Sequence, residues 1–214
     1  QIDDIISLDP AEAYELSGIE VLANTYDRIM RFEPTDVNKL VPGVAESVTV
    51  GDDGQTFTFK IRAGQKFASG NPVTAGDAAW SLQRVIKLEK TPVFLLSQLG
   101  WTKDNVDQMV TAPDDSTLVV KIGVKFAPTL VYALLGSVVG SVVDSKVAME
   151  HEAAGDMGNG WLKNNSAGSG AYIVKSWTPN DSVAMEANPN YRGGVAALKR
   201  VVIRHIPEAS AQRL

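Results

Sequence analysis

The stretch LVPGVAESVTVGDDGQTFTFKIR, residues 40–62, predicts a β-hairpin. In its second half, TFTFKI, apolar side chains alternate with polar ones, which is typical of a strand that buries one face. The Asp-Asp-Gly sequence at 52–54 supplies the turn between the two strands. We therefore expect paired strands at residues 44–50 and 56–61.

The same Asp-Asp-Gly sequence superficially resembles part of a calcium-binding loop. A calcium loop needs further oxygen ligands at later positions and a terminal glutamate, and these are missing here. Its place between two alternating segments favours a hairpin turn. The sequence therefore predicts no metal site.

Outward from this hairpin, strands and helices are mixed without strict alternation. Apolar residues have helical spacing from Ser17 to Met30, with Ser17 as the expected N-cap and Glu20 completing a capping box. Thr74 is expected to cap a second helix, with Asp77 at its third position. This arrangement indicates an α+β or mixed α/β fold. Further strands are expected at 5–8, 110–112, 118–122, 171–177, 183–187 and 199–206, and further helices near 94–99, 128–135 and 144–154.

The composition is that of an ordinary globular protein of 214 residues, with 44% hydrophobic and 21% charged residues. The net charge of −5, from 20 basic and 25 acidic residues, argues against nucleic acid or an anionic membrane as the principal partner. The absence of cysteine excludes a disulfide scaffold, a thiolate zinc site and a cysteine nucleophile. The longest apolar run, 126–143, is interrupted by proline and glycine, so we expect no membrane span.

Both ends of the sequence bear on what kind of chain this is. It opens on Asp3 and Asp4 instead of a basic and apolar leader, so an exported protein would have lost its signal peptide. Residues 208–214 read as the opening of a helix that stops after about two turns. We therefore expect the chain to be a fragment.

Catalytic machinery is not indicated. His151 lies in a polar helical stretch and His205 in an alternating strand, and no Gly-x-Ser-x-Gly motif accompanies either. The paired carboxylates Glu12 and Glu15 leave an acid–base hydrolase as the least favoured alternative, because no partner base is placed near them. The glycines of residues 168–170 lead into a strand, so we expect them to allow close packing and not to bind phosphate. We expect no enzyme, no cofactor and no metal.

Three stretches resemble motifs of the family 5 solute-binding proteins of ABC importers. The first is the hairpin at 40–62, and the second is GQKFASGNPVTAGD at 64–77. The third runs from GSGAY at 168–172 to NPNY at 188–191 and is followed by IPEA at 206–209. These motifs occur in the family's order and span most of the chain. The departures from the family pattern affect a loop and cap positions, namely Ala68-Ser69, Gly76 and Ser169-Gly170-Ala171.

The resemblance implies a mixed α/β, periplasmic-binding-protein-like fold with two lobes that close on a solute. This chain would cover much of the first lobe: its main subdomain at 1–43 and 169–214, and the extra subdomain of peptide-type binders at 44–168. The implied function is capture of a peptide or similar small solute in the periplasm, or elsewhere outside the cytoplasmic membrane, and delivery to ABC permease subunits. Without a second lobe, exposed strand edges favour self-association of the chain.

The resemblance also indicates where a ligand binds. In relatives, the loop after the first strand lines the cleft, and here that loop is residues 11–16. Its backbone would pair with an extended peptide, Tyr14 would stack on the ligand, and Glu15 would meet a cationic group. Relatives also bind nickel complexes, opines and sugars, so the ligand class stays open, as does a role as an interaction domain without transport. The candidate ligand-binding residues are Ala13, Tyr14, Glu15, Leu16, Phe94 and Trp101.

Overall fold

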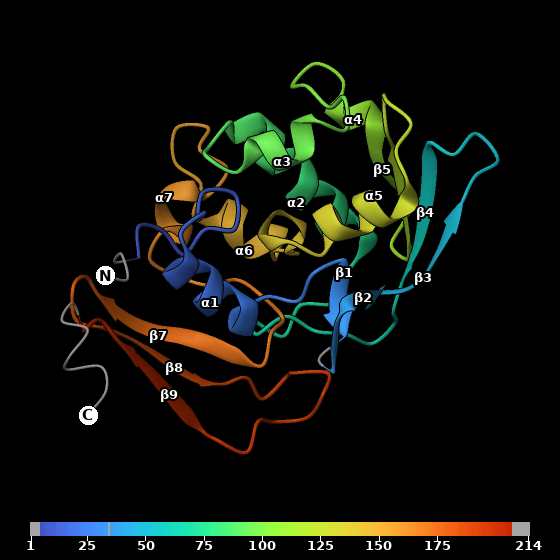
Figure 1. The fold of residues 1–214 in the computed structure, drawn as a ribbon. Helices are drawn as coiled ribbons and strands as arrows, with labels where there is room; N and C mark the ends of the chain where they lie inside the picture. Colours follow the sequence, from blue (N-terminus) through green and yellow to red (C-terminus); the bar gives the residue numbers. More distant parts are fainter. Residues whose placement is uncertain (1–4, 34, 207–214) are drawn as a thin grey trace.

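The computed structural model describes residues 5–33 and 35–206 and shows three antiparallel sheets with short helices packed among them (Figure 1). The expected helical opening at 208–214 lies outside these residues. The helices are α1 (Leu16–Thr25), α2 (Ala75–Leu88), α3 (Val93–Ser97), α4 (Val106–Met109), α5 (Pro128–Leu135), the 3₁₀ turn η1 (Val138–Gly140), α6 (Ser145–Glu150) and α7 (Asn159–Leu162). The strands are β1 (Met30–Glu33), β2 (Asp36–Pro42), β3 (Ala45–Val50), β4 (Thr56–Ile61), β5 (Val110–Asp114), β6 (Thr117–Lys121), β7 (Tyr172–Thr178), β8 (Ser182–Ala187) and β9 (Arg200–Arg204).

A four-stranded sheet in the order β3-β4-β6-β5 carries the larger core. Phe57 lies opposite Val120, and Phe59 lies opposite Leu118, and all four side chains are fully buried. The helix α2 packs against β5 and β6. The predicted hairpin is thus confirmed, because its alternating apolar residues form the buried face of the sheet.

The start of α2 follows the predicted chemistry. The Asp77 N–H donates to Thr74 Oγ1 at 3.1 Å, and the Thr74 N–H donates to Asp77 Oδ2 at 3.0 Å. These two bonds form a capping box, which satisfies amide groups that have no partner inside the helix. At 14 residues, α2 is the longest described helix, and no helix among residues 5–33 and 35–206 is long and apolar enough to cross a membrane.

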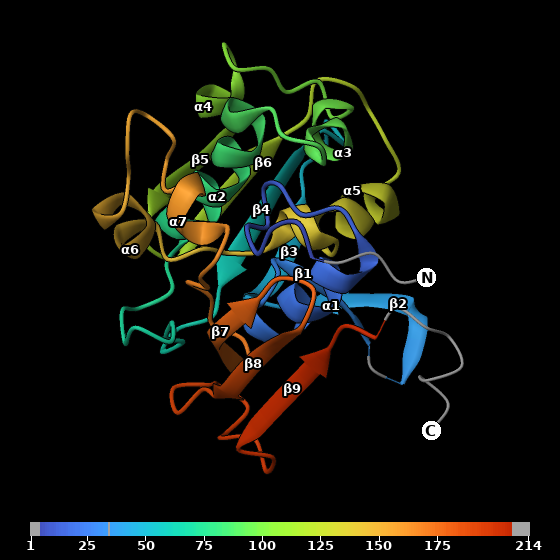
Figure 2. The same ribbon diagram turned by 90° about the vertical axis from the view of Figure 1, so that its left-hand side faces the viewer.

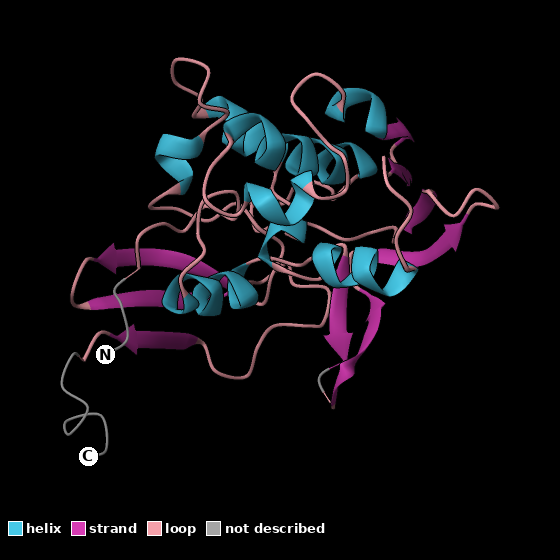
Figure 3. Cartoon of the chain, turned by 45° about the horizontal axis from the view of Figure 1, so that its top comes forward, coloured by secondary structure: helices cyan, strands magenta, loops and turns pink. Residues whose placement is uncertain are grey.

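A three-stranded sheet in the order β7-β8-β9 carries a second, smaller core (Figure 2). Ile5 and Leu8 from the N-terminal segment and Val21 from α1 pack there against Val183 and Met185 of β8. The first residues of the chain and the strands near its other end therefore form one hydrophobic cluster. Figure 3 shows this sheet and the separate β1–β2 pair as distinct groups of strands.

Several expected elements differ in the structure. Residues 5–8 form no strand, although Ile5 and Leu8 are buried as their apolar character predicts. The helix expected from Ser17 to Met30 begins at Leu16 and ends at Thr25, and Ser17 is not its cap. The chain then becomes extended, so that Met30 starts β1. The spacing of apolar residues did not distinguish a helix from an extended chain at residues 26–30, because a short run of buried apolar residues is compatible with both.

The segment that returns to β7 passes very close to the end of α1. The Gly170 N–H donates to the Thr25 carbonyl oxygen at 3.0 Å. A Cβ atom on Gly168 would lie 2.1 Å from the same oxygen, well inside van der Waals contact. The prediction that these glycines allow close packing is confirmed.

Candidate ligand-binding site

The loop between residue 9 and α1 is folded tightly around Asp9. The carbonyl oxygen of Asp9 accepts hydrogen bonds from the N–H groups of Glu12, at 2.9 Å, and Ala13, at 2.8 Å. Its side-chain oxygen Oδ1 accepts a third, from the Ala11 N–H at 2.9 Å. Aspartate favours such turns because its short side chain reaches the backbone amide two residues further on. One residue therefore fixes the first half of the loop.

Glu15 fixes the second half. Its carboxylate accepts hydrogen bonds from the Tyr14 N–H and the Ile6 N–H, both at 3.0 Å. Both carboxylate oxygens of Glu15 therefore hold the loop, and the expected meeting of Glu15 with a cationic ligand group stays a prediction. Glu15, and not Ser17, occupies the N-cap position of α1, and its side chain makes no hydrogen bond to the first turn of the helix.

These bonds use every backbone N–H group from residue 11 to residue 14 within the protein. An extended peptide would thus find no free N–H donor among them, so the expected strand-like pairing with this part of the loop, which stays a prediction, would have to use its carbonyl oxygens. The side chains of the loop remain candidates for contact with a ligand. The backbone of the loop serves mainly to hold them in place.

The structure brings two of the candidate aromatic residues together. The Tyr14 and Phe94 rings meet edge to face, with centroids 5.3 Å apart and planes at 83°. Their side chains are still 46% and 48% exposed, and Leu16, the first residue of α1, is 83% exposed. Edge-to-face contact is a favoured geometry for aromatic pairs. Tyr14, Leu16 and Phe94 are thus presented to solvent, whereas Ala13 is buried beneath them.

Trp101 does not share the exposure of this pair. It is only 2% exposed, and its indole Nε1–H donates to the Lys121 carbonyl oxygen at 2.7 Å. It contributes to the wall of a shallow groove between the end of α2, α3 and residues 101–104. An aromatic residue beside a predicted loop is ambiguous in the sequence, and here the indole anchors that loop to β6.

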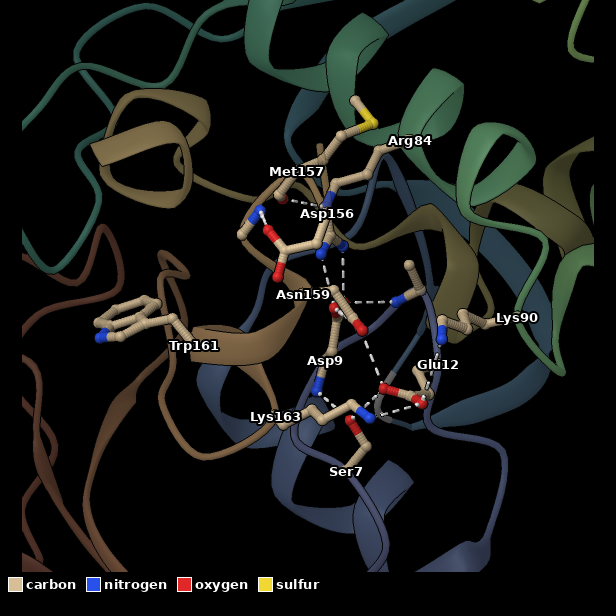
Figure 4. A network of polar contacts seen from close by, with 12 residues as sticks. Ser7, Asp9, Glu12, Arg84, Lys90, Asp156, Met157, Asn159, Trp161 and Lys163 are labelled. Atoms are coloured by element: carbon tan, nitrogen blue, oxygen red, sulfur yellow. Dashed lines mark hydrogen bonds and ion pairs between the residues drawn. The ribbon is translucent and has the colours of Figure 1, made fainter. Parts of the chain in front are cut away.

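A buried polar network beneath the loop was not anticipated from the sequence (Figure 4). The Arg84 guanidinium on α2 donates to both carboxylate oxygens of Asp9, at 2.7 and 2.6 Å. Both side chains are almost completely buried, at 1% and 0% exposure. Arg84 Nε–H also donates to the Met157 carbonyl oxygen at 2.8 Å. No sequence pattern linked Asp9 to an arginine 75 residues away.

Asn159 at the start of α7 extends the network to Glu12. Its side-chain amide donates to Asp9 Oδ2 at 2.7 Å and to Glu12 Oε2 at 3.0 Å. Glu12 also forms an ion pair with Lys163 at 3.2 Å and lies 4.0 Å from Lys90. The Glu12 carboxylate therefore attracts both lysine ammonium groups and anchors the loop. Among residues 5–33 and 35–206, no group of three or more histidine, cysteine or acidic side chains is arranged to hold a metal ion.

His151, one of the two histidines considered as a catalytic base, is exposed and stacks on Trp161, with ring centroids 4.3 Å apart and planes at 9°. Glu12 and Glu15, weighed as a carboxylate pair, each have hydrogen-bond partners of their own. The arrangement favours a rigid recognition surface that presents aromatic and aliphatic side chains.

The structure superimposes on the Escherichia coli murein tripeptide-binding protein MppA with a TM-score of 0.84 and 27% identity, covering 100% of this chain and 42% of that one. Residues 39–214 match the family model described as bacterial extracellular solute-binding proteins, family 5 Middle, and the chain belongs to this family. The family and fold class predicted from the sequence motifs are confirmed.

Two proteins from Escherichia coli (strain K12) are similar to this chain in sequence. The chain is 31% identical over 212 residues to the probable D,D-dipeptide-binding periplasmic protein DdpA, covering 97% of this chain and 39% of DdpA. It is 32% identical over 201 residues to the periplasmic oligopeptide-binding protein OppA, covering 88% of this chain and 35% of OppA. These relatives are binding proteins by name. The chain spans well under half of their length, as a part of one lobe would.

Proposed function

We propose that the protein carrying this chain captures a peptide or similar small solute outside the cytoplasmic membrane and delivers it to the permease of an ABC importer. Membership of the solute-binding family supports this assignment, and the names of the similar proteins describe periplasmic peptide binding. The proposal includes a binding role without catalysis and a periplasmic or other extracytoplasmic location. We also propose that residues 1–43 and 169–214 form the main subdomain of the first lobe and that residues 44–168 form the extra subdomain.

The single observation that carries the site is the exposed edge-to-face pair formed by Tyr14, on an internally bonded loop, and Phe94 of α3. A rigid aromatic surface binds ligand groups with little loss of conformational entropy, because the loop is already ordered. We propose that Tyr14, Leu16 and Phe94 contact the solute directly, whereas Ala13 and Glu15 shape the loop. Trp101 supports the neighbouring segment without touching the ligand.

The test is a thermal-shift and calorimetric screen of the full-length protein with di-, tri- and oligopeptides. A bound ligand at a hundredfold excess over its Kd stabilises the folded protein by about 2.7 kcal/mol. Truncating either aromatic ring removes about 1 kcal/mol of contact energy, so Tyr14→Ala and Phe94→Ala should each raise the Kd about fivefold.

Phe32→Ala provides the matched control. Phe32 is an aromatic residue of similar exposure, 43%, but lies on β1 and not on the loop. Its removal should leave the Kd unchanged. A full-length protein that responds to no small solute, or one in which all three variants weaken binding equally, would contradict the proposal.

A further inference from the structure

Asp9 controls the loop that presents Tyr14 through both its backbone and its side chain. Three consecutive N–H groups, those of residues 11, 12 and 13, end on its oxygens. If the Asp9 side chain rotated, the Ala11 bond would be lost, whereas the two bonds to the backbone carbonyl oxygen do not involve the side chain. The direction of the Asp9 carboxylate therefore fixes the start of the loop at Ala11.

That direction is imposed by Arg84 and Asn159. The planar guanidinium engages both carboxylate oxygens at once, which fixes the orientation of the carboxylate as well as its position. Arg84 is itself held by the Met157 carbonyl oxygen, and Asn159 approaches Asp9 Oδ2 from α7. Exposed fractions of 1% for Arg84 and 6% for Asn159 place both below the surface. Neither reaches solvent to touch a solute.

Asn159 also holds Glu12 in place. Asn159 donates to Glu12 Oε2 as well as to Asp9 Oδ2, so one side chain ties together two points of the loop that lie one turn apart. The Ser7 hydroxyl and the ammonium groups of Lys163 and Lys90 are the other partners of the Glu12 carboxylate. Figure 4 shows Arg84 reaching the loop from α2, Asn159 from α7, and Ser7 from the segment that precedes the loop.

Resting on the proposed function, we propose that Asp9, Arg84 and Asn159 are positioning residues for ligand binding. They act by holding residues 11–16 in the one geometry in which Tyr14 meets Phe94. When a binding-competent state is populated only for a fraction of the time, the measured Kd rises by the inverse of that fraction. A loop that keeps this geometry about a tenth of the time would bind about tenfold more weakly.

The test compares Arg84→Lys and Asp9→Asn with Leu82→Ala in the full-length protein. Lysine at position 84 keeps the positive charge but cannot donate to both carboxylate oxygens of Asp9 as the planar guanidinium does. Asparagine at position 9 keeps the shape of aspartate and an oxygen that can accept the Ala11 N–H. Leu82 lies on the same helix and is fully buried in the larger core, so its truncation lowers the melting temperature without touching the network.

Two measurements are made on each variant. Hydrogen exchange of the amides at 11–14 in the ligand-free protein should speed up about tenfold in Arg84→Lys and Asp9→Asn, but not selectively in Leu82→Ala. The Kd for the tripeptide Ala-Phe-Ala should rise about tenfold in the first two variants and stay near wild type in the third, at a temperature where all are folded.

Unchanged exchange at 11–14 in both network variants would overturn the positioning role, as would equal losses of affinity in all three. If the wild-type protein fails to bind Ala-Phe-Ala and every other peptide screened, the transport proposal fails instead. The exchange measurement still decides whether the network positions the loop, because it needs no ligand.

Discussion

Gly168 lies against the last turn of α1, and its replacement by alanine introduces a methyl group where there is no space. The new Cβ would lie 2.1 Å from the Thr25 carbonyl oxygen and 2.7 Å from the Tyr26 ring. The oxygen belongs to backbone and also accepts the Gly170 N–H at 3.0 Å, so it cannot move without weakening that bond. The strands after Gly168 and the end of α1 must therefore separate.

The expected loss of stability is about 2–4 kcal/mol. Overpacking of a close-packed interior costs about 1–3 kcal/mol, and a weakened buried hydrogen bond adds about 1 kcal/mol. For a domain of this size, each kcal/mol corresponds to about 2–4 °C in the melting temperature. Gly168→Ala should therefore melt about 4–16 °C below the wild type.

Differential scanning calorimetry and urea denaturation of both forms measure this change. Gly76→Ala is the matched control, because Gly76 lies in the first turn of α2 and a Cβ there would have its nearest neighbour, Thr74 Oγ1, at 3.4 Å. That substitution should stabilise the protein by about 0.5–1 kcal/mol, since alanine loses less backbone entropy in a helix. A Gly168→Ala protein within about 0.5 kcal/mol of wild type would refute the packing argument, because overpacking costs more than that.

Two further outcomes are expected. Tyr26→Phe removes the oxygen that accepts the Ala167 N–H at 3.0 Å, leaving a buried donor unpaired, and should cost about 1–3 kcal/mol by urea denaturation; an unchanged midpoint would contradict this. Hydrogen bonds from the Thr56 hydroxyl and from the amides of Gln55 and Thr56 lower the pKa of Asp53 to about 2. Because the folded-state pKa is depressed, the stabilising contribution is present above pH 3.8 and is lost as the pH falls through about 2. An NMR titration of the Asp53 carboxyl carbon should give this pKa, and Thr56→Ala should raise it, whereas an ordinary value in the wild type would exclude the bonding pattern.

Local patterns predicted the elements whose partners lie nearby in the sequence. The β3–β4 hairpin follows from alternation and a short turn, and the capping box of α2 involves residues only three positions apart. The end of α1 was not predicted, because Tyr26, Ile29 and Met30 are buried whether the chain is helical or extended. In that case the packing of the surrounding elements decides the conformation, and propensity does not.

The candidate site divides in the same way. Tyr14 and Phe94 were both named from the sequence, but their contact depends on how the N-terminal loop lies against the segment that begins α3. The inward turn of Glu15 and the burial of Trp101 also depend on neighbours distant in sequence. Residue type shows what a side chain is able to do, whereas its direction depends on which backbone groups surround it.

By itself, the sequence determined the class of fold, the family and the region of the loop, because these rest on periodicity and on motifs that are local and ordered along the chain. Only the tertiary structure decided that Arg84 and Asn159 converge on Asp9 and thereby shape the loop. A buried ion pair forms between residues that folding brings together, and its stability depends on exclusion of water by the whole surrounding core. No local pattern carries that information.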